Sequence, residues 1–261
     1  MISIIFVLSW AIYIACMYLF VSDLLWLLPV WLVSGYAVGW LVIVLTLFIH
    51  LPFMKMIAPD HPYKYYVTRS VALFVNVFAL RLKIQIEGMK NIPKTGMLTL
   101  YANHKSYADP FIIMRFMKRP ITFTPKMSVY KAFFIGKWLA TMGAFPIDRS
   151  SDRNTARALV DAIKIVKKGM AMAIFPEGGI KDRDEEQMVA MRAGAYKLAM
   201  KAGADLLPVR IIGSTEIKRR APFRRTRIRV VIMPVVRYEK VKHMTTNEVA
   251  DLMFTMINKT K

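Results

Sequence analysis

Hydrophobic and polar positions divide the chain into two parts of different character. From residue 1 to residue 54 the only formal charge is Asp23, and two apolar runs, Ile2–Val21 and Leu24–Ile49, lie on either side of it. A helix of about 20 apolar residues crosses the hydrocarbon core of a bilayer, and both runs reach that length. We therefore expect residues 1–54 to form a membrane-embedded helical hairpin.

The apolar part is consistent with two arrangements. The two helices can both cross the bilayer, with Asp23 on the far side, or the hairpin can enter one leaflet only, an option that Pro29, Gly35 and Gly39 keep open. A hairpin buried in a soluble core fits the length of the runs less well. A cleavable signal peptide would begin with a basic segment, and this chain has none.

From residue 55 onward, strand-like runs alternate with segments of helical periodicity. Residues 65–80 carry apolar side chains at helical spacing, which suits either a helix lying on the bilayer or the first helix packed on a sheet. Strands are predicted at 82–87, 97–102, 121–125, 170–176, 205–212 and 227–236, and further helices at 110–118, 132–143, 152–168, 191–203 and 245–259. This alternation predicts an α/β domain over residues 55–261, with a largely parallel sheet flanked by helices.

Charge is distributed as unevenly as hydropathy. The chain has 38 Lys and Arg against 17 Asp and Glu, a net charge of +21, and every Lys and Arg lies at or after Lys55. Such a surplus attracts anionic lipids, nucleic acids and phosphorylated substrates. Beside an apolar segment it favours a membrane surface, with the basic domain on the cytoplasmic side of the cell membrane. The densest stretch, residues 218–229, is either a patch for an anionic ligand or a solvated loop and strand edge.

A histidine and an aspartate follow the strand predicted at 97–102. In "NHKSYADP", His104 precedes Asp109, and Pro110 marks a helix start. Asp is favoured just before such a proline, so helix capping alone explains Asp109. The alternative is a general base with a carboxylate that fixes its tautomer. The position favours this alternative, because ligands bind at the carboxyl ends of strands in open α/β sheets.

Two more polar groups follow short apolar runs. "AIFPEGG" places Glu177 before Gly178, where the backbone can turn tightly and approach a ligand, whereas a plain β-turn would need no acid. "GAFPIDRS" contains Arg149, whose guanidinium can bind phosphate oxygens or pair with Asp148. Neither stretch is a dinucleotide-binding fingerprint or a P-loop.

Taken together, these stretches resemble the glycerolipid acyltransferases typified by bacterial 1-acyl-glycerol-3-phosphate acyltransferase. The H-x4-D block of that family matches "HKSYAD", and its F-P-E-G block matches "FPEG" at 175–178. A block with an Ile-Asp-Arg core matches residues 147–149, and a final V-P-V-type block matches "LPV" at 207–209. The four blocks occur in the family's order over roughly residues 82–236, which makes the resemblance specific.

The resemblance implies a role for each matching residue. His104 would be the general base that takes the proton of the acceptor hydroxyl, and Asp109 would orient it. The acceptor oxygen would attack an acyl thioester directly, without an acyl-enzyme. Glu177 and Gly178 would help to place the glycerol of the acceptor. Two cations would face its phosphate, and these are Arg149 and Lys126.

The chain departs from the family at two adjacent positions that concern the acceptor. Members usually continue F-P-E-G with Thr and Arg, whereas this chain has Gly179 and Ile180. The arginine expected to clamp the phosphate is therefore missing at its own position, and Lys181 and Arg183 are the candidates to replace it. The departure bears on the identity of the acceptor more than on the reaction type.

The sequence thus predicts a membrane-bound acyltransferase that makes phosphatidate from lysophosphatidate, with acyl-CoA or acyl carrier protein as donor and no cofactor. Another lysolipid or glycerol-3-phosphate is the alternative acceptor. A non-catalytic module that binds anionic lipid or nucleic acid would leave the polar blocks without a purpose, and no nucleic-acid motif is present. A metal site is not expected, because Cys16 is the only cysteine and the four histidines form no ligand motif.

Overall fold

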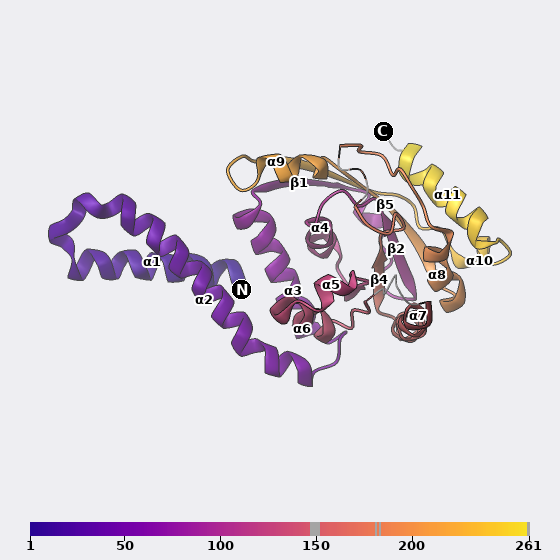
Figure 1. Ribbon diagram of the computed structural model, residues 1–261, viewed down its shortest axis with the longest axis horizontal. Coiled ribbons are helices and arrows are strands. Elements are labelled where there is room, and N and C mark those ends of the chain that lie inside the picture. Colours follow the sequence, from indigo (N-terminus) through magenta and orange to yellow (C-terminus); the bar gives the residue numbers. More distant parts are fainter. Residues whose placement is uncertain (147–151, 181, 183, 260–261) are drawn as a thin grey trace.

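An apolar helical hairpin leads the chain and an α/β domain follows it (Figure 1). The computed structural model describes residues 1–146, 152–180, 182 and 184–259, without the side chains of 152–156. The hairpin consists of α1 (Ile2–Phe20), a 3-10 turn η1 (Ser22–Leu27) and α2 (Leu28–Met56). Both helices are long and apolar enough to cross a membrane, and few of their side chains are buried. The two predicted apolar helices are confirmed.

A six-stranded sheet forms the centre of the described part of the α/β domain. Its strand order is β1-β6-β5-β2-β4-β3. All neighbouring strands in the described sheet run parallel except β5 and β6, which confirms the prediction of a largely parallel sheet. The strands are β1 (Leu82–Glu87), β2 (Leu98–Ala102), β3 (Ile121–Phe123), β4 (Ala171–Ile174), β5 (Asp205–Ile212) and β6 (Thr226–Ile232).

Helices cover both faces of this sheet, which buries apolar side chains on each side of it (Figure 1). The α-helices are α3 (Pro62–Phe74), α4 (Asp109–Phe116), α5 (Met127–Tyr130), α6 (Phe133–Thr141), α7 (Asp152–Lys167), α8 (Lys197–Ala202), α9 (Ile217–Arg220), α10 (Tyr238–Val241) and α11 (Thr246–Lys259). Shorter turns are the π-helical η2 (Val75–Ala79) and the 3-10 turns η3 (Met89–Asn91), η4 (Ala193–Tyr196) and η5 (Ser214–Glu216). Ile112 and Phe116 of α4 pack on one face of the sheet, and Val166, Leu198 and Met253 belong to the core on the other.

An aromatic cluster joins the hairpin to the α/β domain. The ring of Phe6 in α1 is fully buried and lies 5.1 Å from the rings of Phe74 in α3 and Phe78 in η2. Gly39 of α2 allows this close packing, because a Cβ atom there would lie 2.8 Å from the Phe6 ring. Since α3 contacts both α1 and α4, the segment that suited either a surface helix or a packed helix is packed between hairpin and domain.

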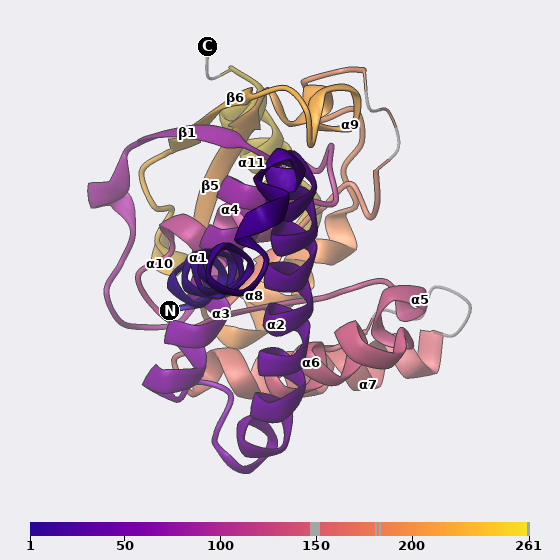
Figure 2. The ribbon, with the colours of Figure 1, turned by 90° about the vertical axis from the view of Figure 1, so that its left-hand side faces the viewer.

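A second contact runs along the lower half of α2. Viewed from the hairpin side, α2 passes close to α6 (Figure 2). Phe48 of α2 stacks on Phe134 of α6 with ring centroids 4.7 Å apart and planes 19° from parallel. The hairpin is thus attached to the domain by aromatic rings at two places.

Candidate active site

The loops that carry His104 and Glu177 both begin at the carboxyl ends of inner strands of the sheet. β2 and β4 are parallel neighbours with Tyr101 paired to Ile174, so the loops that follow them emerge side by side. The first loop carries His104 and runs into α4, and the second carries Glu177. The register therefore brings the two polar blocks together at the carboxyl ends of neighbouring strands.

His104 and Asp109 face each other across the turn that begins α4. The Nδ1 atom of His104 lies 2.9 Å from Oδ2 of Asp109, whose side chain is fully buried. The same oxygen accepts the backbone N–H groups of Lys105 at 2.8 Å and Ser106 at 2.9 Å. The carboxylate therefore binds the loop before it rather than the first amides of its own helix, and it holds the loop and the imidazole together.

The second ring nitrogen of His104 is available to a substrate. Its ring stacks on Phe175 with centroids 4.0 Å apart, and 15% of the side chain is exposed. When Nδ1–H donates to a carboxylate, the neutral imidazole carries its lone pair on Nε2. Nε2 has no hydrogen-bond partner among the described residues. This arrangement suits a general base, which needs one fixed nitrogen and one free one.

Glu177 holds the loop that carries His104 through two contacts of its carboxylate. Its Oε1 atom accepts the backbone N–H of His104 at 2.8 Å, and its Oε2 atom lies 3.1 Å from Nζ of Lys105. The side chains of Glu177 and Lys105 are both fully buried. A buried carboxylate needs such a partner, because desolvation of an unpaired charge costs several kcal/mol. Lys105 was not among the predicted site residues.

Asn103 fixes the start of the same loop. Its side-chain amide donates to the carbonyl of Ile211 and accepts the N–H of Ile211, both at 2.8 Å. Ile211 belongs to β5, the other neighbour of β2, so the loop is held from both sides of its strand. An asparagine directly after a buried strand is the only sequence signal of this role.

The turn after Glu177 requires glycine. Gly178 has a φ of 71° and Gly179 a φ of 147°, both in the range that L residues rarely adopt. The side chain of Arg192 lies over Gly178, since a Cβ atom there would be 2.8 Å from its Nε. The N–H of Arg192 donates to the carbonyl of Pro176 at 3.0 Å, which fixes its backbone to the turn.

Arg192 is a further residue that sequence reasoning missed. Its side chain is exposed, and its guanidinium has no hydrogen-bond or ion-pair partner among the described residues. It occurs in "MRAGAY", at the start of a helical segment, where a solvated arginine is unremarkable. Only the fold brings it to the turn that holds Glu177.

Of the other predicted phosphate contacts, the structure describes only Lys126. Lys126 is exposed and follows β3, which lies two strands away from β2. It is therefore at the same, carboxyl, end of the strands as His104. Arg149, Lys181 and Arg183 lie outside the described residues. Within the described part of the chain, no three His, Cys, Asp or Glu side chains gather in a way that could hold a metal ion.

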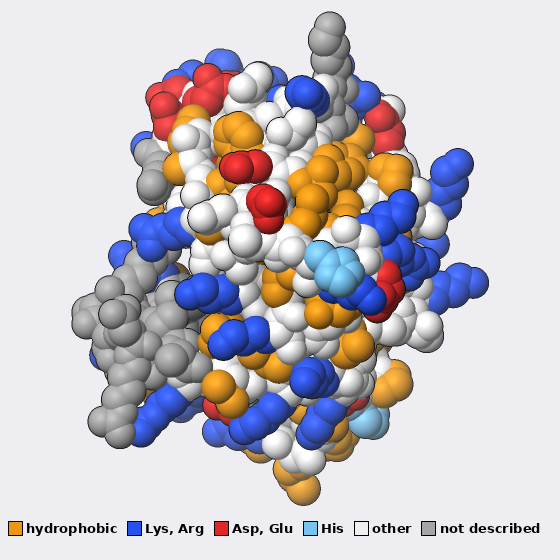
Figure 3. Space-filling view, turned by 90° about the vertical axis from the view of Figure 1, so that its right-hand side faces the viewer, with side chains coloured by type: hydrophobic (Ala, Val, Ile, Leu, Met, Phe, Trp, Pro, Cys, Tyr) orange, Lys and Arg blue, Asp and Glu red, His pale blue; other side chains and the backbone are white. Residues whose placement is uncertain are grey.

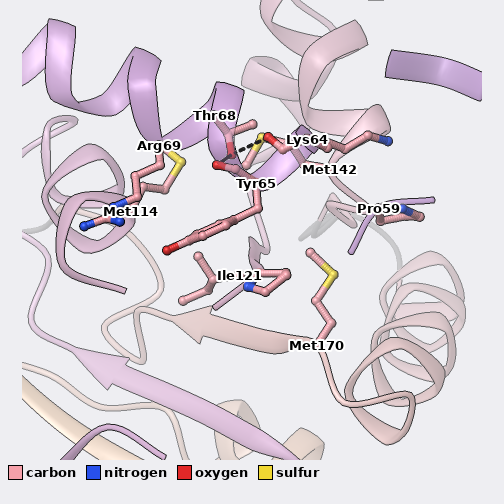
Figure 4. Close-up of a pocket in the computed structure, with 10 residues that line it drawn as sticks. Pro59, Lys64, Tyr65, Thr68, Arg69, Met114, Ile121, Met142 and Met170 are labelled. Atoms are coloured by element: carbon pink, nitrogen blue, oxygen red, sulfur yellow. Dashed lines mark hydrogen bonds between the residues drawn. The ribbon is translucent and has the colours of Figure 1, made fainter. Parts of the chain in front are cut away.

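A small pocket lies away from these residues, between α3, α4 and β3 (Figure 4). Three methionines, Ile121 and Tyr65 are among its lining side chains, and its free volume of about 10 Å³ is that of one water molecule. Beside it Lys64 is buried, with Nζ donating to the carbonyls of Ile57 at 2.8 Å and Thr141 at 2.7 Å. Burial lowers the pKa of Lys64. No described residue of the His104 or Glu177 loops lines this pocket.

Comparison with known proteins agrees with the motifs. The family model "Acyltransferase" matches residues 83–212, about half of the chain, and this range includes the loops of His104 and Glu177. The chain belongs to the acyltransferase family. The matched region begins in β1 and ends with β5, so it covers the strands from which both site loops leave.

Curated relatives of this acyltransferase share one description. This chain is 31% identical over 144 residues to the "1-acyl-sn-glycerol-3-phosphate acyltransferase" of Borreliella burgdorferi, and the match covers 55% of this chain and 57% of that protein. It is also 31% identical over 154 residues to the "Probable 1-acyl-sn-glycerol-3-phosphate acyltransferase" of Mycoplasma pneumoniae, covering 57% and 55%. The matches thus span little more than half the length of these relatives.

A solved structure confirms the fold. The acyltransferase aligns with the crystal structure of the 1-acyl-sn-glycerophosphate acyltransferase of Thermotoga maritima, with a TM-score of 0.57 and 21% identity. The alignment covers 81% of this chain and 95% of the other. At this identity the likeness concerns the α/β architecture with its leading helices.

Proposed function

We propose that this acyltransferase transfers a fatty acyl group from a thioester to the sn-2 hydroxyl of 1-acyl-glycerol-3-phosphate and so makes phosphatidate. The observation that carries the proposal is the contact between His104 and buried Asp109, which leaves Nε2 free at the carboxyl edge of the sheet. The descriptions of the relatives support the choice of acceptor.

In the proposed reaction His104 is the general base. The Nε2 lone pair takes the proton of the acceptor hydroxyl, and the oxygen attacks the carbonyl carbon of the thioester. A C–O bond forms and the C–S bond breaks. The imidazolium, stabilised by Asp109, returns its proton to the leaving thiolate, so that no acyl-enzyme is needed. Acyl-CoA or an acylated carrier protein would serve as donor.

Glu177 and Lys105 would support this base rather than react. Because the Glu177 carboxylate is fully buried and accepts the N–H of His104, we assign it a positioning role through the histidine loop. Gly178 would then let the backbone and the acceptor glycerol approach each other. This division explains why an acid is needed before the glycines, which a plain turn would not require.

Arg192 is the described cation that best suits the acceptor phosphate. It lies on the turn that follows Glu177, is exposed, and has no partner among the described residues that would have to be displaced. Arginine binds phosphate through two parallel N–H donors. We propose that it supplies the contact for which the sequence lacks an arginine at position 180. Lys126, Arg149, Lys181 and Arg183 stay predictions for the same role.

The hairpin would bring this site to its substrates. Acceptor and product both carry acyl chains and reside in the bilayer, so we propose that residues 1–54 anchor the domain of residues 55–261 to the membrane. The excess of Lys and Arg in that domain supports the cytoplasmic side. A soluble donor would then reach the site from the cytoplasm.

One observation favours a second candidate acceptor. Gly179 and Ile180 replace the Thr and Arg expected from the family resemblance. Should Arg192 not contact phosphate, an uncharged lysolipid would be accepted as readily as lysophosphatidate. Glycerol-3-phosphate is a third acceptor that the same assay includes.

The experiment is an acylation assay with the purified full-length chain in detergent. We expect phosphatidate, identified by mass, from lysophosphatidate and at least one of acyl-CoA and acyl carrier protein, with lower rates for uncharged lysolipids and glycerol-3-phosphate. His104→Ala should lower the rate about 10²–10⁴-fold, the usual contribution of a general base. Full activity in His104→Ala would disprove the mechanism, and turnover of uncharged acceptors alone would disprove the acceptor.

A further inference from the structure

The connection between α9 and β6 gathers basic side chains with few acids beside them. We call residues 218–227 the basic turn. Its exposed cations are Lys218, Arg219, Arg220, Arg224, Arg225 and Arg227. Arg219 pairs with Asp184 at 2.6 Å and approaches Glu216 at 3.8 Å. The other five have no ion-pair partner among the described residues, so the turn carries a concentrated positive charge.

The adjacent strand β1 adds a further cation to this charge. Lys83 of β1 lies beside Arg227 of β6 in the parallel register, and both side chains are exposed. Like charges on adjacent strands repel each other, so an anion bound across them would remove a penalty. The Oγ1 of Thr226 is buried without a hydrogen-bond partner, and Thr226 lines a groove together with Glu216, Arg220, Arg224, Arg225 and Arg227.

The turn also presents an exposed aromatic ring on a backbone that is held by hydrogen bonds. Phe223 is 84% exposed, the highest value among the large apolar side chains of the described α/β domain. Its carbonyl accepts a hydrogen bond from Arg81 at 2.7 Å, and Arg220 donates to the carbonyl of Arg225 at 3.2 Å. An aromatic ring among cations is the combination that membrane-surface segments use, with the ring in the interface and the cations at the headgroups.

The basic turn lies on the side of the domain from which the hairpin projects. In Figure 1 it forms the end of the domain that is directed toward the hairpin, and in Figure 2 both face the viewer. The opposite face, shown in Figure 3, carries Lys and Arg side chains with Asp and Glu side chains among them. The turn is therefore distinguished by its excess of cations over the two acids beside it, Asp184 and Glu216, by its exposed ring and by its position.

We propose that the basic turn docks on anionic lipid headgroups of the leaflet that holds the hairpin. The inference rests on the membrane placement in the proposed function and adds a second attachment point to it. Charge complementarity and the shared side of the molecule select a bilayer over an acidic protein. Two attachment points fix the orientation of the α/β domain, whereas a hairpin alone leaves it free to tilt.

The test places a probe at the tip of the turn. A Phe223→Cys chain, in a Cys16→Ser background, is labelled with a polarity-sensitive fluorophore and reconstituted into vesicles that carry a spin-labelled lipid. We expect quenching in vesicles with anionic phosphatidylglycerol and little in vesicles of phosphatidylcholine alone. Removing two arginines, in Arg224→Gln with Arg225→Gln, should weaken docking about 30-fold. Reconstitution through the hairpin should be unchanged.

A matched control removes the same charge elsewhere. Lys197→Gln with Lys201→Gln changes two exposed cations of α8, at the other end of the domain, and should keep the quenching. Equal quenching in neutral vesicles, or equal losses in both double variants, would overturn the proposal. So would burial of the probe only on addition of acidic acyl carrier protein, which would assign the turn to the donor. If the quenching is as expected but the acylation assay yields no phosphatidate, the proposed acceptor is disproved and the docking proposal stands.

Discussion

The candidate active site around His104, Asp109 and Glu177, which we call the corner, and the aromatic cluster of Phe6, Phe74 and Phe78, which we call the junction, are held together by different means. At the corner, short polar contacts between buried groups fix individual atoms, as in the bonds from Asp109 to His104 and from Glu177 to the His104 backbone. At the junction, the rings around Phe6 pack without a charged contact to it. Directional bonds set a tautomer and an orientation, whereas apolar packing sets only proximity. The chemistry needs the first, and attachment to the domain needs only the second.

The two buried lysines show the same contrast within one residue type. Lys105 at the corner pairs with the carboxylate of Glu177 at 3.1 Å. Lys64 near the junction donates only to carbonyls, those of Ile57 and Thr141, and burial lowers its pKa. The first lysine compensates a charge that also holds the backbone of His104. The second ties together segments at the ends of α2 and α6.

The largest effect on folding should come from breaking the buried pair at the corner. Lys105→Met leaves Glu177 buried and unpaired, which typically costs about 3–5 kcal/mol. We expect a correspondingly lower free energy of unfolding, measured by denaturant titration in detergent, and a lower kcat from a displaced His104. Glu177→Gln in the same chain should recover much of the stability, because it removes the stranded charge.

An exposed pair provides the control for this prediction. Lys164 lies 3.0 Å from Asp161 on α7, with 67% of its side chain exposed. Lys164→Met should change stability by no more than about 0.5 kcal/mol, as is usual for exposed helical pairs. Equal losses for Lys105→Met and Lys164→Met would show that the corner is not the pre-organised site described here.

The junction should respond with a loss of attachment rather than of chemistry. Phe6→Ala removes a buried ring between Phe74 and Phe78, at a cost of about 3 kcal/mol, the lower end of the range for such truncations. We expect faster hydrogen exchange in α1 and η2, and unchanged turnover of an acceptor dispersed in detergent. A kcat loss as large as that of Lys105→Met would break the comparison, since it would mean that the junction positions the catalytic groups.

Much of this architecture could be predicted from local pattern. The apolar runs before Met54 predicted the hairpin helices, and the spacing of strands and helices predicted the α/β sheet. The contact of His104 with Asp109 is also local, because both lie in one short loop between a strand and a helix. The strand order, and the antiparallel pairing of β5 with β6, depend on long-range packing that no single segment encodes.

The supporting residues depend on contacts between distant segments. Lys105 meets Glu177 across 72 positions of sequence, so nothing near either residue marks it as paired. Arg192 reaches Gly178 only because the chain returns to the turn through the bond to Pro176. The predicted roles of Lys126, Arg149, Lys181 and Arg183 stay predictions, because they require a bound acceptor to be tested.

The smallest effect on stability is expected for the exposed Arg192, in contrast to the buried groups of the same site. Arg192→Gln removes a side chain that has no partner in the described protein, so the free energy of unfolding should not change. A charge-assisted hydrogen bond contributes about 1.5–3 kcal/mol, so the KM for lysophosphatidate should rise about 10-fold or more at nearly constant kcat. Steady-state kinetics with an uncharged lysolipid, whose KM should not change, isolates the phosphate.

Gly178→Ala is the companion variant, because its new methyl group would displace the Arg192 side chain and strain a backbone at positive φ. It should raise the KM as Arg192→Gln does, and the strained conformation should also lower the free energy of unfolding by about 1–3 kcal/mol. Arg192→Lys should restore part of the affinity, since lysine keeps the charge without the two-pronged geometry. If the unmodified protein acylates lysophosphatidate and Arg192→Gln leaves the KM unchanged, Arg192 does not contact the phosphate. Lys126 and Arg149 would then be the next candidates for this contact.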